Sequence, residues 1–195
     1  MKHHRTIEQV LEDYPKELIL KDGTGATLRP LREGDEKALR KMYAGFPEDE
    51  LWFLELDLSH EGVFERWIEN LKKTPLVSVV AMVEGRIIGD AVLLMKAHGA
   101  ETHLGRIRIS VAPSYRELRL GTWMLLDLVN AAIALGLEML EMDLVEDRDA
   151  AVIDGVGKIG FEESAVVKDH FRDRQGEPHG LVIMTKALPV EWGDF

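Results

Sequence analysis

Residues 111–125 read VAPSYRELRLGTWML, and this stretch decides which fold the chain adopts. It places a proline after an alternating apolar run, then Arg116, Arg119 and Gly121 ahead of a long apolar helix pattern. A helix N-terminus offers unpaired N–H groups and about half a positive charge, so such a turn can bind a pyrophosphate. An ordinary helix start explains the same residues equally well, with Gly121 relieving crowding and the arginines in solvent. Local chemistry leaves both interpretations open.

The segments on either side of this turn predict a strand–helix–strand crossover. Residues 103–112 alternate as a strand that Pro113 stops, and residues 116–135 repeat apolar side chains at helical spacing up to Gly136. Residues 139–145 alternate again, as expected for the strand that follows.

The rest of the chain predicts strands and helices on both sides of this crossover. A short helix over 6–14 precedes two strands around the turn DGTG, and a hairpin turns at Glu84-Gly85. Asp35 is the predicted N-cap of the helix that follows it. The remaining expected elements are helices within 36–46, 63–73 and 148–161 and strands at 164–171 and 180–188. This order predicts an α/β (α+β) fold with a mixed, largely antiparallel central sheet of about seven strands flanked by about four helices. We expect one domain over 1–195, with residues 1–14 as an N-terminal helical extension.

Composition excludes several classes of function. The 195 residues include 46% hydrophobic residues and no cysteine, so thiol nucleophiles, disulfides and thiolate metal sites are absent. The net charge of −11, from 35 acidic against 24 basic residues, argues against nucleic-acid binding. The sequence shows no membrane span or secretory signal and no histidine arrangement that fixes a metal, so we expect a cytoplasmic protein without a metal.

The opening stretch resembles motif A of the GNAT superfamily of N-acyltransferases. In that motif a strand ending in V-x-P precedes Q/R-x-x-G-x-G/A, which opens a helix that grips the pyrophosphate of acyl-CoA. KIGF at 158–161 resembles the end of the family's fourth helix, and residues 14–39 resemble the start of the GNAT modules that acetylate protein lysines. The resemblance covers about residues 14–188, and the motif positions that match are Val111, Pro113, Tyr115, Arg116 and Gly121.

The resemblance implies acetyl-CoA as the acyl donor and a primary amine as the acceptor, either a protein lysine or a small cationic amine. Backbone groups of Ile109 and Val111 would bond the pantetheine arm and the thioester carbonyl, where N–H donors stabilise the oxyanion. The pyrophosphate would be held by the turn and helix start, through Arg116, Leu118, Arg119, Gly121 and Thr122.

Four positions depart from the family pattern. Arg119 replaces the first glycine of the motif, where its side chain either clamps a phosphate or obstructs the loop. Arg106 stands where the lysine-acetylating relatives have a glutamate general base, and arginine cannot accept a proton at neutral pH. Val156 and Ala150 replace a tyrosine proton donor and an asparagine.

Catalysis would then rest on His103, Asp90 or Asp143, with Glu141 on the same strand face as Asp143. Each also has a structural interpretation, as a strand-end histidine, a turn residue or solvent-facing carboxylates. A general base accelerates such a step by about 10²–10⁴-fold, so water as proton carrier would leave a weaker catalyst.

Three functions compete. The first is an acetyl-CoA-dependent N-acetyltransferase, the second is a non-catalytic acyl-CoA sensor or regulatory domain, and the third is an interaction module that has lost the ligand. The acceptor, the acyl length and a homodimer are left open by the sequence.

Overall fold

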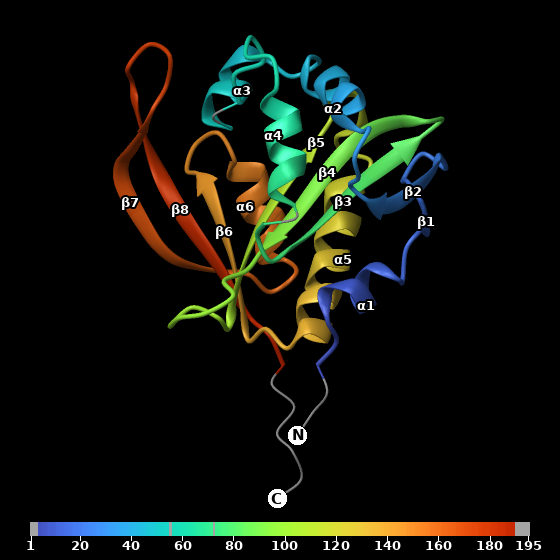
Figure 1. The fold of residues 1–195 in the computed structure, drawn as a ribbon. Helices are drawn as coiled ribbons and strands as arrows, with labels where there is room; N and C mark the ends of the chain where they lie inside the picture. The colour runs from blue at the N-terminus through green and yellow to red at the C-terminus, as the bar shows by residue number, and fades with distance from the viewer. Residues whose placement is uncertain (1–3, 55, 72, 190–195) are drawn as a thin grey trace, which may run out of the picture.

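The computed structural model describes residues 4–54, 56–71 and 73–189. Residues 1–3 of the predicted N-terminal extension lie outside this part of the chain. Within it the strands form one eight-stranded sheet in the order β1-β2-β3-β4-β5-β6-β8-β7 (Figure 1), one strand more than expected. The strands are β1 (Lys16–Ile19), β2 (Gly25–Pro30), β3 (Leu76–Val83), β4 (Arg86–Leu94), β5 (Leu104–Val111), β6 (Met139–Val145), β7 (Glu162–Arg172) and β8 (Pro178–Ala187).

Every neighbouring pair in the sheet is antiparallel except β5 and β6, which are parallel. A parallel pair needs a long crossover connection, and here the connection is helix α5 (Leu120–Leu135). The predicted mixed, largely antiparallel sheet with one crossover is therefore confirmed.

Two apolar clusters cover the two faces of the sheet. The first packs α5 and the short helix α1 (Ile7–Leu11) against one face, and the second packs α2 (Glu36–Tyr43) and α4 (Val63–Asn70) against the other. Two further helices are α3 (Glu48–Phe53) and α6 (Ala150–Gly157). The short helices α1 and α3 are additional to the helices that were expected to flank the sheet. Helix α1 lies in the N-terminal extension that was predicted to be helical.

Helix α5 begins later than its apolar pattern suggested. A 3₁₀ turn, η1 (Pro113–Tyr115), follows β5, and positive φ angles at Glu117 and Arg119 delay the helix to Leu120. The helix ends as predicted at Gly136, which caps it with a φ of 81°.

A β-bulge places one side chain that matters for the site. The pairing of β3 with β4 shifts register between Ala81 and Met82, so Ile88 is an extra residue in β4. Beyond the bulge, Ala91 faces α5 and Asp90 points to the opposite face, under α2. Among the described helices, none has the length and apolar character needed to cross a bilayer.

Candidate functional site

Strands β5 and β6 separate along their length. They are paired only from Leu104 to Arg106, opposite Met139 to Glu141, whereas β5 continues to Val111 and β6 to Val145. Figure 1 shows them diverging toward the end of the sheet where α3 lies. The parting leaves a stretch of strand edge without its neighbouring strand.

The backbone groups on this edge follow from strand alternation. The Ala112 N–H donates to Ile88 O at 2.9 Å, so residues 108 and 110 also face β4. The backbone groups of Ile107, Ile109 and Val111 consequently face the opening. The Ile109 and Val111 groups named from the sequence thus lie on the exposed edge of β5.

The N-terminus of α5 stands next to this opening. Its first internal bond runs from the Trp123 N–H to Arg119 O at 3.1 Å, and no side chain caps the helix. The N–H groups of Leu120, Gly121 and Thr122 precede the first internal donor, the Trp123 N–H, and are free for a ligand. A Cβ at Gly121 would meet only Val111 Cγ2, at 3.7 Å, so the backbone there is open to approach. This is the geometry that an anion requires.

Arg119 occupies the N-cap in the left-handed region, with φ 65° and ψ 10°. Glycine adopts this conformation without strain, which explains why the motif has glycine there. The Arg119 side chain is exposed.

Arg116 is held by helix α3. Its guanidinium donates to both carboxylate oxygens of Glu50, at 2.8 and 2.5 Å, and Nε donates to Val111 O at 3.2 Å. The ring of Phe46 lies 5.4 Å from the guanidinium carbon. Arg116 therefore links α3 to the open edge of β5. Nearby, Leu118 O accepts a bond from the Lys21 N–H.

Asp90 lies on the other face of the sheet, 3% exposed. The Tyr43 hydroxyl donates to Asp90 Oδ1 at 2.6 Å. Burial raises the pKa of Asp90 to about 6, against the lowering effects of the Tyr43 hydrogen bond and of Arg108. Burial and the Asp90 charge also raise the pKa of Tyr43, whereas hydrogen bonding with Ser110 lowers it. Ser110 is the register partner of Asp90 in β5.

The other catalytic candidates from the sequence lie apart from this pair. His103 is exposed, and its carbonyl accepts bonds from the Glu138 and Met139 N–H groups, at the closed end of the parting strands. Asp143 is exposed on β6, beyond the last residue paired with β5. The structure therefore brings Asp143 to the opening and leaves His103 at the opposite end.

The positions that depart from the family pattern have structural partners. Arg106 forms an ion pair with Glu141, at 2.8 Å, in the last paired register before the strands separate. Val156 is buried in the core and accepts bonds at its carbonyl from Ile159 and Phe161. Neither position supplies a proton carrier.

Sequence analysis missed Tyr43, Ser110 and Glu50. Tyr43 lies in the helix predicted within 36–46 and Ser110 in the strand predicted at 103–112, and neither residue was assigned a role there. A tyrosine in an otherwise aliphatic helix face was the one available signal, since a buried phenol needs a hydrogen-bond partner.

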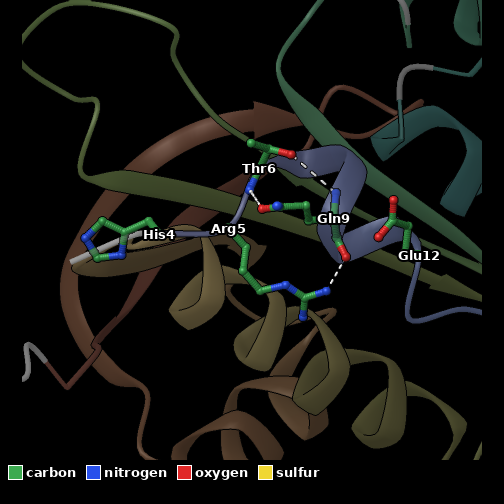
Figure 2. Close-up of a pocket in the computed structure, with 5 residues that line it drawn as sticks. All are labelled: His4, Arg5, Thr6, Gln9 and Glu12. Atoms are coloured by element: carbon green, nitrogen blue, oxygen red, sulfur yellow. Dashed lines mark hydrogen bonds between the residues drawn. The ribbon is translucent and has the colours of Figure 1, made fainter.

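A separate hollow, about 550 Å³, lies along α1 (Figure 2). Its polar groups bond one another: the Thr6 N–H donates to Gln9 Oε1 at 2.9 Å, and Arg5 donates to Gln9 O. Across residues 4–54, 56–71 and 73–189, no cluster of three or more His, Asp or Glu side chains is arranged to hold a metal ion.

Comparisons with known proteins agree with this geometry. The Acetyltransferase (GNAT) family matches residues 38–161, whereas a search of curated protein sequences gave no significant match. Among solved structures, the ribosomal-protein-alanine N-acetyltransferase of Brucella melitensis superimposes with a TM-score of 0.69 at 23% identity, over 83% of this chain and 99% of that one. The GNAT domain of S. lividans PAT superimposes with a TM-score of 0.70 at 15% identity, over 89% of this chain and 97% of that one. The yncA protein of Salmonella typhimurium, solved with its cofactor acetyl-CoA, superimposes with a TM-score of 0.68 at 18% identity, over 84% of this chain and 94% of that one. The chain belongs to the GNAT family of acetyltransferases, and acetyl-CoA is the acetyl donor of that family.

Proposed function

We propose that this protein transfers the acetyl group of acetyl-CoA to a primary amine. One observation carries the proposal: the uncapped N-terminus of α5 stands directly beside the unpaired edge of β5. A donor with a pyrophosphate at one end and an amide-bearing arm at the other fits both features, because each offers backbone N–H groups.

Different parts of the proposed site bind different parts of acetyl-CoA. The N–H groups of Leu120, Gly121 and Thr122 hold the pyrophosphate, and the edge groups of Ile109 and Val111 orient the pantetheine arm. A backbone N–H on this edge stabilises the negative charge that develops on the thioester oxygen as the amine attacks. Acetyl-CoA supplies the activated acetyl group.

The acceptor approaches from the face of the sheet that carries Asp143. An exposed carboxylate beyond the last paired residue of β6 can hold a cationic amine beside the opening. The acceptor class we propose is accordingly a lysine side chain or a small cationic amine. The cytoplasmic location, the single domain and the homodimer stay predictions.

A second function is an acyl-CoA sensor without turnover. Arg106 is paired with Glu141 and Val156 is buried, so the two proton carriers expected in this family are absent from their usual places. Such a protein binds acetyl-CoA through the same backbone groups and releases no thiol.

The test combines binding with turnover. Acetyl-CoA is added to wild type, Gly121→Glu and the matched control Gly121→Ala, and melting temperature is recorded. Alanine fits because its Cβ makes an ordinary contact, whereas glutamate places a negative charge against the pyrophosphate. We expect stabilisation by about 2.7 kcal/mol at 100 times Kd for wild type and Gly121→Ala, and none for Gly121→Glu.

Thiol release is then followed with a lysine peptide, a peptide with a free N-terminus and a diamine. Release with any of these supports the acetyltransferase. Binding without release selects the sensor, and no binding by wild type contradicts both functions.

A further inference from the structure

A short series of hydroxyl groups connects the open edge of β5 with a carboxylate buried under α2. The Tyr43 hydroxyl donates to Asp90 Oδ1 at 2.6 Å. Ser110 is the register partner of Asp90, so its side chain lies on the same face of the sheet, and hydrogen bonding to Ser110 acts to lower the pKa of Tyr43. We propose that Ser110, Tyr43 and Asp90 form a proton relay that accepts the proton released by the attacking amine. The inference rests on the proposed acetyl transfer and names the proton path that it uses.

Only one member of the relay can touch the acceptor. Tyr43 is 2% exposed and Asp90 3% exposed, whereas Ser110 is half-buried. Ser110 also lies four residues beyond Arg106, where β5 has already separated from β6. Ser110 is therefore the catalytic residue of the relay, and Tyr43 and Asp90 act through it.

The geometry gives the last step of the relay: the Tyr43 hydroxyl donates to Asp90 Oδ1, which is the direction that the reaction needs. A proton leaves the amine nitrogen for Ser110 Oγ while the Ser110 proton passes to Tyr43 Oη and the Tyr43 proton to Asp90 Oδ1. Nitrogen forms its bond to the acetyl carbon, the carbon–sulfur bond breaks, and the electron pair of that bond leaves with sulfur. Asp90 ends neutral and later returns its proton to the thiolate or to water.

The surroundings of Asp90 suit a carboxylate that must be ionised at rest and accept a proton during turnover. Tyr43 faces it from α2, Arg108 is the charged group that acts on it from β5, and its partner Val80 in β3 is apolar. Burial raises the Asp90 pKa to about 6, against the lowering effects of Tyr43 and Arg108. A base is most effective when its pKa lies near the working pH.

The first test compares Ser110→Ala, Tyr43→Phe and Asp90→Asn with the control Ser78→Ala. Ser78 carries another buried hydroxyl, on β3, whose oxygen has no hydrogen-bond partner. With an amine that wild type acetylates, we expect kcat to fall about 100-fold in each relay variant and less than threefold in the control. The KM for acetyl-CoA stays unchanged, and the double variants lose no more than the single ones because the three groups act as a unit.

The second test uses pH. Wild-type kcat should fall below an apparent pKa of about 6, where Asp90 becomes protonated, and Asp90→Asn should lack this limb. A readout independent of turnover is the ¹³C NMR titration of the Asp90 carboxyl in the protein without ligands. We expect it to titrate near 6 and to shift upward in Tyr43→Phe, which removes a hydrogen bond to the charged form.

The outcomes separate the relay from the proposed function. Relay variants that keep kcat within threefold and keep the acidic limb, or an Asp90 that titrates at its ordinary value, overturn the relay and leave acetyl transfer standing. A wild type that binds acetyl-CoA and acetylates none of the amines overturns both.

Discussion

Helix α2 has a buried aspartate at each end, and the two carboxylates are held in opposite ways. At the start of the helix, Asp35 accepts two bonds from the Arg29 guanidinium, both at 2.7 Å, and one from the Arg32 N–H at 3.0 Å. At the other end, Asp90 has the Tyr43 hydroxyl at 2.6 Å. Burial acts to raise the pKa of Asp35, but Arg29 and Arg32 outweigh it and lower that pKa, whereas the pKa of Asp90 is raised to about 6.

The contrast separates a structural carboxylate from a functional one. A buried ion with complete hydrogen bonding keeps its charge, and removing its partner is strongly destabilising, whereas a buried carboxylate with a single neutral donor destabilises the fold in its charged form. Natural sequences break such rules mainly at functional sites. Asp90 therefore points to chemistry, and Asp35 fixes the start of α2 against β2.

The largest expected effect is at Asp35. Asp35→Asn leaves the Arg29 guanidinium buried without its ion pair, so we expect the free energy of unfolding to fall by about 3 kcal/mol at pH 7. Because the folded pKa of Asp35 is lowered, the difference from wild type should shrink as pH falls through that pKa. Urea unfolding at several pH values measures it. A neutral effect would remove the contrast between the two ends of α2.

Asp90→Asn should act with the opposite sign. The folded pKa of about 6 exceeds the ordinary 3.8, so wild type loses stability as pH rises from about 4 through 6. The variant has no such carboxyl to ionise, so we expect it to be more stable than wild type by up to about 3 kcal/mol at pH 7.5 and equal to it near pH 3.5. The same urea series measures this. A variant less stable than wild type at neutral pH would place Asp90 with Asp35, as a structural carboxylate.

Arg119 provides a second comparison, which concerns backbone strain and not buried charge. Its φ of 65° costs a side-chain-bearing residue about 1 kcal/mol, so Arg119→Gly should raise stability by roughly that amount. Glu117→Gly is the matched control, because Glu117 has a φ of 62° and lies outside the helix start. Calorimetric titration with acetyl-CoA should show tighter binding for Arg119→Gly alone, because glycine at this N-cap lets the backbone approach the pyrophosphate more closely. Equal changes in stability and in acetyl-CoA affinity in both variants would mean that Arg119 has no specific role in the phosphate-binding turn at the start of α5.

The smallest effect is expected at the exposed ion pair of Glu50 with Arg116. The two side chains are 19% and 40% exposed, so Glu50→Gln should cost about 0.5 kcal/mol of stability. It also frees Arg116 for an anion, so we expect acetyl-CoA to bind a few-fold more tightly, with a steeper salt dependence. Titrations at low and high salt test this, with Glu48→Gln, a second acidic residue of α3, as control. Weaker binding of acetyl-CoA to Glu50→Gln would show that Arg116 contributes to binding only while Glu50 holds it in position.

Much of the fold could be predicted because its elements follow local rules. Apolar periodicity and Gly136 gave the crossover helix and its end, and the hairpin at Glu84-Gly85 follows from composition alone. The start of α5 was predicted too early because Glu117 and Arg119 adopt positive φ angles, which are unusual for residues other than glycine and could not be predicted from these residue types. Helix α3 was missed because its six residues bury no side chain and carry no periodic signal.

The sequence by itself predicted the donor side of the proposed site. Phosphate and pantetheine would be bound by backbone groups at a strand end and a helix start, and Pro113, Gly121 and the apolar pattern of α5 encode both locally. Only the tertiary structure brought together the residues that we propose for the acceptor side. Tyr43, Asp90 and Ser110 come from a helix and two strands, and their chemistry depends on burial, register and the bulge at Ile88, which arise when distant segments pack together.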